Sequence, residues 1–161
     1  ARMVGLNAIR ANILSEHVEE NLEFPGITQL VAGTPNDEVN SLATREFAHI
    51  FGKANVWQIT PSDQDAHHTT TMASHRRGRI CFTENPTSSR LQALARQDAI
   101  IKKTTLTEFF TLEHFHSTYG DDAVILFLHG EDKGLRPAAA ELEDVPAGTT
   151  ICAIVRPAQS P

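Results

Sequence analysis

The sequence has only two cysteines and no long apolar run, which argues against a disulfide-stapled secreted protein and against a membrane-spanning chain. No segment reaches the roughly 18 consecutive apolar residues of a membrane span, and the N-terminus lacks the charged-then-apolar layout of a signal peptide. Cys81 and Cys152 each lie inside an apolar stretch, where a free thiol behaves as a small hydrophobic side chain. A disulfide between them is the alternative, although nothing else resembles a stapled secreted scaffold. The sequence therefore predicts a domain that folds in water in a reducing compartment.

Positive charge is also scarce, with a formal net charge of −6. The one basic cluster, residues 75–79, is too short for a nucleic-acid footprint, so nucleic acid is not an expected partner. The same cluster could lie against anionic lipid head groups if the chain is tethered near a membrane, or could simply belong to a solvated linker.

Motifs that carry catalysis or bind metals are missing as well. The sequence contains no HExxH, CxxC, GxSxG or Walker P-loop pattern. One loop is rich in possible metal ligands, namely Asp63, Asp65, His67, His68 and His75, but adjacent histidines seldom ligate one ion. We expect neither a native metal nor catalysis by this chain.

The first sixty residues alternate short apolar runs with amphipathic helical patterns, which is typical of a parallel α/β sheet. Strands are predicted over 6–11, 27–33 and 55–60. A single helix is predicted between the last two strands, with Thr34 as its N-terminal cap and Gly52 as its C-terminal cap in the left-handed (αL) conformation. Its apolar side chains recur at helical spacing, at Val39, Leu42, Ala43, Phe47, Ile50 and Phe51.

A second unit follows a polar segment that carries no sustained periodicity. Strands are predicted over 79–83, 99–105, 123–129 and 150–155, with helices capped near Thr87 and Thr111. The predicted fold class is α/β, a truncated Rossmann-like parallel sheet followed by a second small α/β (α+β) unit. The predicted divisions are a first domain over 1–61, a linker over 62–78 and a second domain over 79–157.

Two predicted strand ends are candidates for ligand binding, because ligands of open parallel sheets lie beyond the carboxyl ends of the strands. One is the loop at Thr34, Asn36 and Asp37, and the other is the loop at Asn12 and Ile13. In each case the alternative is a purely structural turn with a helix cap. The acidic residues of the first loop suit hydroxyl or amino donors better than phosphate.

Three stretches carry a resemblance to a known family: LNAIRANILS at 6–15, ITQLVAGTPNDEVN at 27–40 and VWQI at 56–59. Together they resemble the latter part of the TrkA-type (TrkA-N), or RCK, regulatory domain, in the variant attached to bacterial sodium/proton antiporters. The segment at 34–40 is the most specific of the three. Residues 1 to about 60 carry the resemblance, and 79–156 look like the less characteristic domain that follows it.

The resemblance implies a Rossmann-like fold that binds NAD(H) or an adenine nucleotide and transmits its occupancy to a transmembrane transporter portion of the same polypeptide, usually as a homodimer. It implies a place on the cytoplasmic face of the bacterial inner membrane. Carried over by position, Asn12 and Ile13 match the adenine-side loop, and Thr34, Asn36 and Asp37 match the loop at the next strand end.

The sequence departs from the family in one respect. The glycine-rich turn that approaches the pyrophosphate and the acidic residue that reads the ribose are both missing, and would lie before Ala1. We therefore expect an N-terminally truncated regulatory piece that holds the outer half of a nucleotide site, with no cofactor bound by this fragment alone. The alternatives are a fragment of a soluble NAD-dependent oxidoreductase and a ligand-free dimerisation module.

Overall fold

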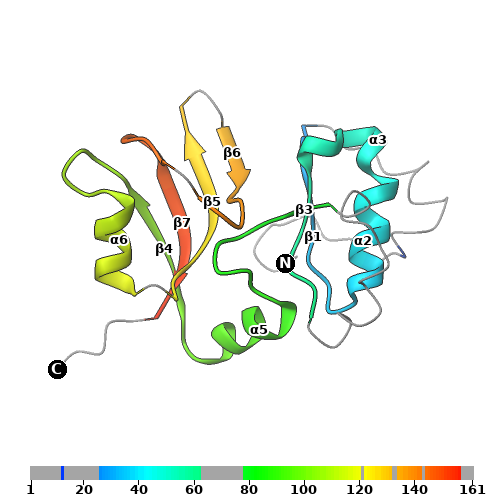
Figure 1. Cartoon of the computed structure of the whole chain (residues 1–161), viewed down its shortest axis with the longest axis horizontal. Coiled ribbons are helices and arrows are strands. Elements are labelled where there is room, and N and C mark those ends of the chain that lie inside the picture. The colour runs from blue at the N-terminus through cyan, green and yellow to red at the C-terminus, as the bar shows by residue number, and fades with distance from the viewer. Residues whose placement is uncertain are drawn as a thin grey trace.

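The chain forms two sheets joined by a crossing segment, as seen in a computed structural model that describes residues 12, 26–62, 78–120, 122–131, 134–142 and 144–156 (Figure 1). The first sheet is parallel and carries helices, and the second is antiparallel. In Figure 1 they lie side by side, with helix α5 (Ser88–Arg96) below the gap between them. The predicted α/β class is confirmed.

The parallel sheet contains β1 (Leu30–Ala32), β2 (Val56–Gln58) and β3 (Arg79–Ile80), in that spatial order. Between β1 and β2 run α2 (Asp37–Glu46), α3 (Ala48–Phe51) and the short 3-10 helix η2 (Lys53–Asn55). The predicted strand–helix–strand unit is thus present, while the strand predicted over 6–11 lies outside the described residues.

Three details of the predicted helix are wrong. It is broken at Phe47 into α2 and α3. Its cap is Asn36, whose side chain accepts a hydrogen bond from the Val39 amide, because Thr34 is engaged elsewhere. Gly52 does have a positive φ of 80°, but its ψ of 147° lies outside the left-handed helical region.

The third strand of the parallel sheet comes from beyond the polar segment. We predicted that strand as the start of the second unit, but β3 pairs in parallel with β2, with Trp57 opposite Arg79 and Gln58 opposite Ile80. The chain then leaves the first sheet directly: Cys81 forms a bridge with Ala139 of the second unit. The sheet boundary therefore falls after Ile80, while the division into domains stays a prediction.

The second sheet has the order β4-β7-β5-β6 and is antiparallel throughout. Its strands are β4 (Ile100–Thr105), β5 (Val124–Gly130), β6 (Gly134–Pro137) and β7 (Thr150–Val155). Helix α6 (Leu112–Tyr119) covers one face, begins at the Thr111 cap as predicted and buries Phe115 completely. We had not predicted β6, whose short GLRP sequence has no strand periodicity.

A shared core joins the two sheets. It combines buried side chains of the first sheet, the crossing segment and the second sheet: Trp57, Ile59, Cys81, Phe82, Leu94 and Val124. A side-chain bridge reinforces it, because the Gln29 amide nitrogen donates to the Leu135 carbonyl (3.0 Å) while its oxygen accepts from the Trp57 indole (3.2 Å). The two sheets are therefore tied by apolar burial and by directed hydrogen bonds.

Among the described residues, no helix is both long and apolar enough to cross a membrane.

Candidate ligand-binding edge of the parallel sheet

The loops that follow β1 and β2 meet at the carboxyl edge of the parallel sheet. Beyond the ends of both strands, the Ile59 amide still donates to the Ala32 carbonyl at 3.1 Å, which holds the two strand ends together. From there one loop runs through residues 33–36 into α2, and the other runs through 59–62. This is the edge at which open parallel sheets bind their ligands.

Thr34 and Asn40 lock the first loop into shape. The Asn40 side-chain oxygen accepts hydrogen bonds from the Thr34 amide (2.9 Å) and hydroxyl (2.7 Å), and its nitrogen donates to the Thr34 carbonyl (2.9 Å). Asn40 is almost fully buried in the first turns of α2. Sequence reasoning missed Asn40; an amide on the buried face of a helix, where an apolar side chain is usual, was the available signal.

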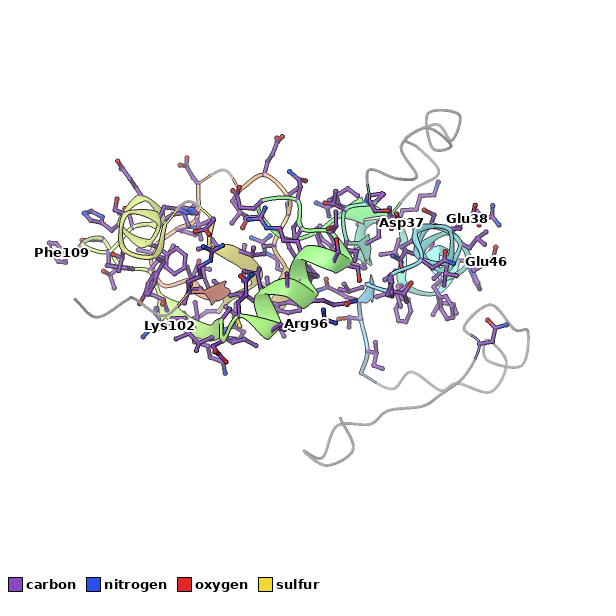
Figure 2. The ribbon with its side chains drawn as sticks, turned by 90° about the horizontal axis from the view of Figure 1, so that it is seen from below. Asp37, Glu38, Glu46, Arg96, Lys102 and Phe109 are labelled. Atoms are coloured by element: carbon purple, nitrogen blue, oxygen red, sulfur yellow. The ribbon has the colours of Figure 1, made fainter. Side chains whose placement is uncertain are left out.

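Asp37 ties the first loop to the second. One of its carboxylate oxygens, Oδ2, accepts from both the Ser62 amide (2.7 Å) and the Ser62 hydroxyl (2.9 Å), and the side chain is only 7% exposed. Figure 2 shows Asp37 on the sheet-facing side of α2, with Glu38 farther out. Asp37 therefore joins the loops that follow β1 and β2.

The structure thus brings together three of the predicted site residues, Thr34, Asn36 and Asp37, and gives each a structural contact. Some hydrogen-bonding capacity remains: within the described residues, neither the side-chain nitrogen of Asn36 (Nδ2) nor Asp37 Oδ1 makes a hydrogen bond. The first turn of α2 is acidic, at Asp37 and Glu38, which offsets the positive helix terminus. The edge therefore suits hydroxyl and amino donors such as a ribose or an adenine edge, rather than a phosphate.

Thr60 is a further polar group at this edge that sequence reasoning missed. Its hydroxyl oxygen is buried and, among the described residues, has no hydrogen-bond partner. A buried hydroxyl without a partner costs about 1–3 kcal/mol relative to a satisfied one. Thr60 lies two residues after the end of β2 and two before Ser62, so it belongs to the same loop as the Ser62 that Asp37 binds.

The other predicted binding loop cannot be placed with the first. Asn12 is exposed, and Ile13 lies outside the described residues, as do the aspartates and histidines of the polar segment. Within the ranges that the structure does describe, no cluster of three or more His, Cys, Asp or Glu side chains could hold a metal ion. The adenine-side role of Asn12 and Ile13 stays a prediction.

Comparison with known proteins adds no family assignment. No protein-family model and no curated protein sequence matches this chain. The edge itself offers hydrogen-bond donors and acceptors on two loops that the contact between Asp37 and Ser62 connects.

Proposed function

We propose that this chain is part of the cytoplasmic regulatory region of a bacterial monovalent-cation transporter, a sodium/proton antiporter, and that the intact protein senses NAD(H) or an adenine nucleotide. The observation that carries the proposal is the position of the TPNDEVN segment, residues 34–40. This segment follows the end of β1 at the carboxyl edge of a parallel sheet. The resemblance implies that the nucleotide is bound at this edge.

The order of the strands supports a Rossmann-like origin. In the second half of that fold the parallel strands lie side by side in the order of the sequence, and β1, β2 and β3 are arranged in this way. A ligand held by the loops after β1 and β2 would also touch the network that Asp37 and Ser62 form between them.

The link between the sheets supports a regulatory role. A ligand can shift a conformational equilibrium only by the difference in its affinity for the two states. Here, a change at the strand ends has a short route to the second sheet, because the chain runs from β3 straight into Cys81 and Phe82. The Phe82 amide donates to Ala138 at 2.7 Å, and the Thr83 hydroxyl accepts from the Ile125 amide at 2.8 Å.

A second candidate, a module for homodimer assembly, is favoured by the exposed edge of the second sheet. β4 pairs only with β7 among the described strands, and Ile101 at its start is 67% exposed. Exposed strand edges and apolar side chains are common sites of association. This role is compatible with nucleotide sensing, since the resemblance implies a homodimer.

The test is ion exchange by the full-length protein in lipid vesicles, with sodium-driven proton movement recorded before and after addition of NADH or ATP to the regulatory side. We expect a nucleotide-dependent change in the exchange rate that the Asp37→Asn variant reduces. An upstream reading frame that encodes no membrane-spanning helices would contradict the transporter assignment, and exchange that ignores every nucleotide would contradict the sensing role.

A further inference from the structure

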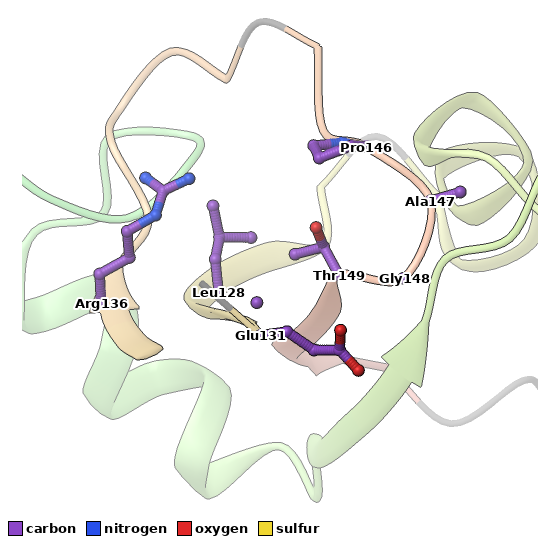
Figure 3. A pocket seen from close by; sticks show the side chains of 8 residues that line it. Leu128, Glu131, Arg136, Pro146, Ala147, Gly148 and Thr149 are labelled. Carbon is purple, nitrogen blue, oxygen red and sulfur yellow. The ribbon is translucent and has the colours of Figure 1, made fainter. Parts of the chain in front are cut away.

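A pocket of about 400 Å³ lies in the second sheet, away from the edge described above. It is formed where the β5–β6 hairpin meets the loop that leads into β7 (Figure 3). Pockets that hold small molecules usually have volumes of about 300–1,000 Å³. The residues that line it are Leu128, Gly130, Glu131, Arg136 and residues 146–149.

Two side chains of opposite charge lie on opposite sides of this pocket. Figure 3 shows Arg136 on one side of Leu128 and Glu131 on the other. Arg136 is half-buried and Glu131 is exposed. Among the described residues, neither the Arg136 guanidinium nor the Glu131 carboxylate makes a hydrogen bond or ion pair. A partly desolvated charge gains most from a ligand group of opposite sign.

The side of the pocket that residues 146–149 form is held in place without a ligand. The loop before β7 is pinned to the residue after β4 by two backbone hydrogen bonds, from the Gly148 amide to the Leu106 carbonyl (2.9 Å) and from the Leu106 amide to the Thr149 carbonyl (2.8 Å). Leu128 beneath it is buried. A preformed site avoids part of the entropic cost of binding.

We propose that this pocket binds a small elongated zwitterion, with a carboxylate at Arg136, an ammonium group at Glu131 and an aliphatic chain against Leu128. The combination of charges selects this class. A simple anion would be repelled by Glu131, and a simple cation by Arg136, whereas a molecule with separated opposite charges satisfies both walls. The inference does not depend on nucleotide binding at the parallel sheet.

The pocket also adjoins the bridge between the sheets. Arg136 directly follows Leu135, whose carbonyl accepts from the Gln29 amide, and Gln29 in turn accepts from the indole of Trp57. Trp57 is the only tryptophan of the chain. A ligand that shifts β6 would change the surroundings of this indole, so tryptophan fluorescence offers a second readout of binding.

The experiment is isothermal titration calorimetry of the chain with 6-aminohexanoate and 4-aminobutyrate as probes. Hexanoate and hexylamine, which each carry one of the two charges, serve as ligand controls. We expect measurable binding of at least one zwitterion and binding at least about tenfold weaker for both single-charge compounds, since each charged hydrogen bond contributes roughly a factor of ten or more. Failure of both zwitterions to bind at millimolar concentration would overturn the proposal.

Variants test which residues are responsible. Arg136→Gln and Glu131→Gln should each weaken zwitterion binding about tenfold or more. The matched control, Arg156→Gln, removes an exposed arginine that pairs with Asp122 at 3.3 Å and does not line the pocket, and should bind like the original chain. Circular dichroism confirms that each variant is folded.

Exchange of the two charges separates recognition from a structural effect. The double variant Arg136→Glu with Glu131→Arg should bind the zwitterion again, in the reversed orientation, better than either single charge reversal does. Binding that Arg136→Gln leaves unchanged, or that the double variant fails to recover, would overturn the assignment. Asp37→Asn should leave zwitterion binding intact, so the outcome is independent of the nucleotide test.

Discussion

The strongest prediction concerns Asp37, the carboxylate that joins the loops after β1 and β2. The Asp37→Ala substitution removes both hydrogen bonds from Ser62, at 2.7 and 2.9 Å, and leaves the half-buried Ser62 amide without its acceptor. A hydrogen bond to a charged group contributes about 1.5–3 kcal/mol, and a carboxylate in the first turn of a helix adds about 0.3–1 kcal/mol. Because water can partly replace the lost acceptor at Ser62, we expect a net loss of about 2–4 kcal/mol.

Urea denaturation followed by Trp57 fluorescence measures this loss as a lower midpoint with an unchanged slope. Glu38→Ala is the matched control, because Glu38 is an exposed carboxylate in the same helical turn, and it should change the free energy of unfolding by less than about 0.5 kcal/mol. Ser62→Ala removes only the hydroxyl donor and should cost about half as much as Asp37→Ala. If Asp37→Ala and Glu38→Ala cost the same, the loop-joining role of Asp37 is refuted.

Three further predictions test other parts of the fold. Gly78→Ala should destabilise the chain by about 1–3 kcal/mol in urea melts, because its Cβ would lie 2.6 Å from the Thr44 methyl carbon. The control Gly130→Ala should be tolerated, because a Cβ there meets no atom within 4 Å. Equal effects of the two substitutions would contradict the close packing of α2 on β3. Glu84 has a φ of +61°, which strains any residue except glycine. Glu84→Gly should therefore raise the free energy of unfolding by about 0.5–1 kcal/mol, and Glu84→Ala should not. An equal gain with alanine would show that the stabilisation comes from removing the side chain and not from relieving the backbone. Burial raises the pKa of the Cys81 thiol from 9.0 to about 12. As the pH rises, the unfolded chain therefore loses this proton first, and the free energy of unfolding should fall by about 1.4 kcal/mol per pH unit between those values. A Cys81→Ala variant whose free energy of unfolding falls equally steeply with pH would contradict this.

Local patterns predicted most of the secondary structure. Alternation of apolar runs and amphipathic segments predicted the α/β class, and β7 was predicted with its observed bounds. The hydroxyl caps Thr87 and Thr111 were found because a cap depends only on its next few residues. The same logic was wrong at the start of α2, where Asn40 holds Thr34 from inside the helix and Asn36 becomes the cap.

Long-range pairing was beyond the sequence. The two-residue strand β3 has no periodicity of its own and is defined by its partner β2, which precedes it by more than twenty residues. Strand β6 is defined in the same way by β5. Ile50 belongs to the apolar side chains that recur at helical spacing, yet it is exposed, while Phe51 of the same short helix is buried. The helix is broken at Phe47, so α3 does not continue the spacing of α2.

The candidate site was predictable in part. The strand-end rule identified Thr34, Asn36 and Asp37, which the structure does bring together. It could not predict that Asp37 binds Ser62, or that the buried Thr60 hydroxyl has no partner among the described residues, since both depend on where the loop after β2 comes to lie.

Nucleotide sensing is tested most directly by a thermal-shift titration with NAD, NADH, ATP and AMP. It compares this chain with a version extended upstream in its own gene to include the glycine-rich turn that the resemblance expects. A ligand that binds only the folded state raises the melting temperature by an amount set by its concentration relative to its dissociation constant. We expect a nucleotide to raise the melting temperature of the extended version and to leave that of this chain unchanged. Absence of a shift in both would contradict nucleotide sensing and favour the role in assembly.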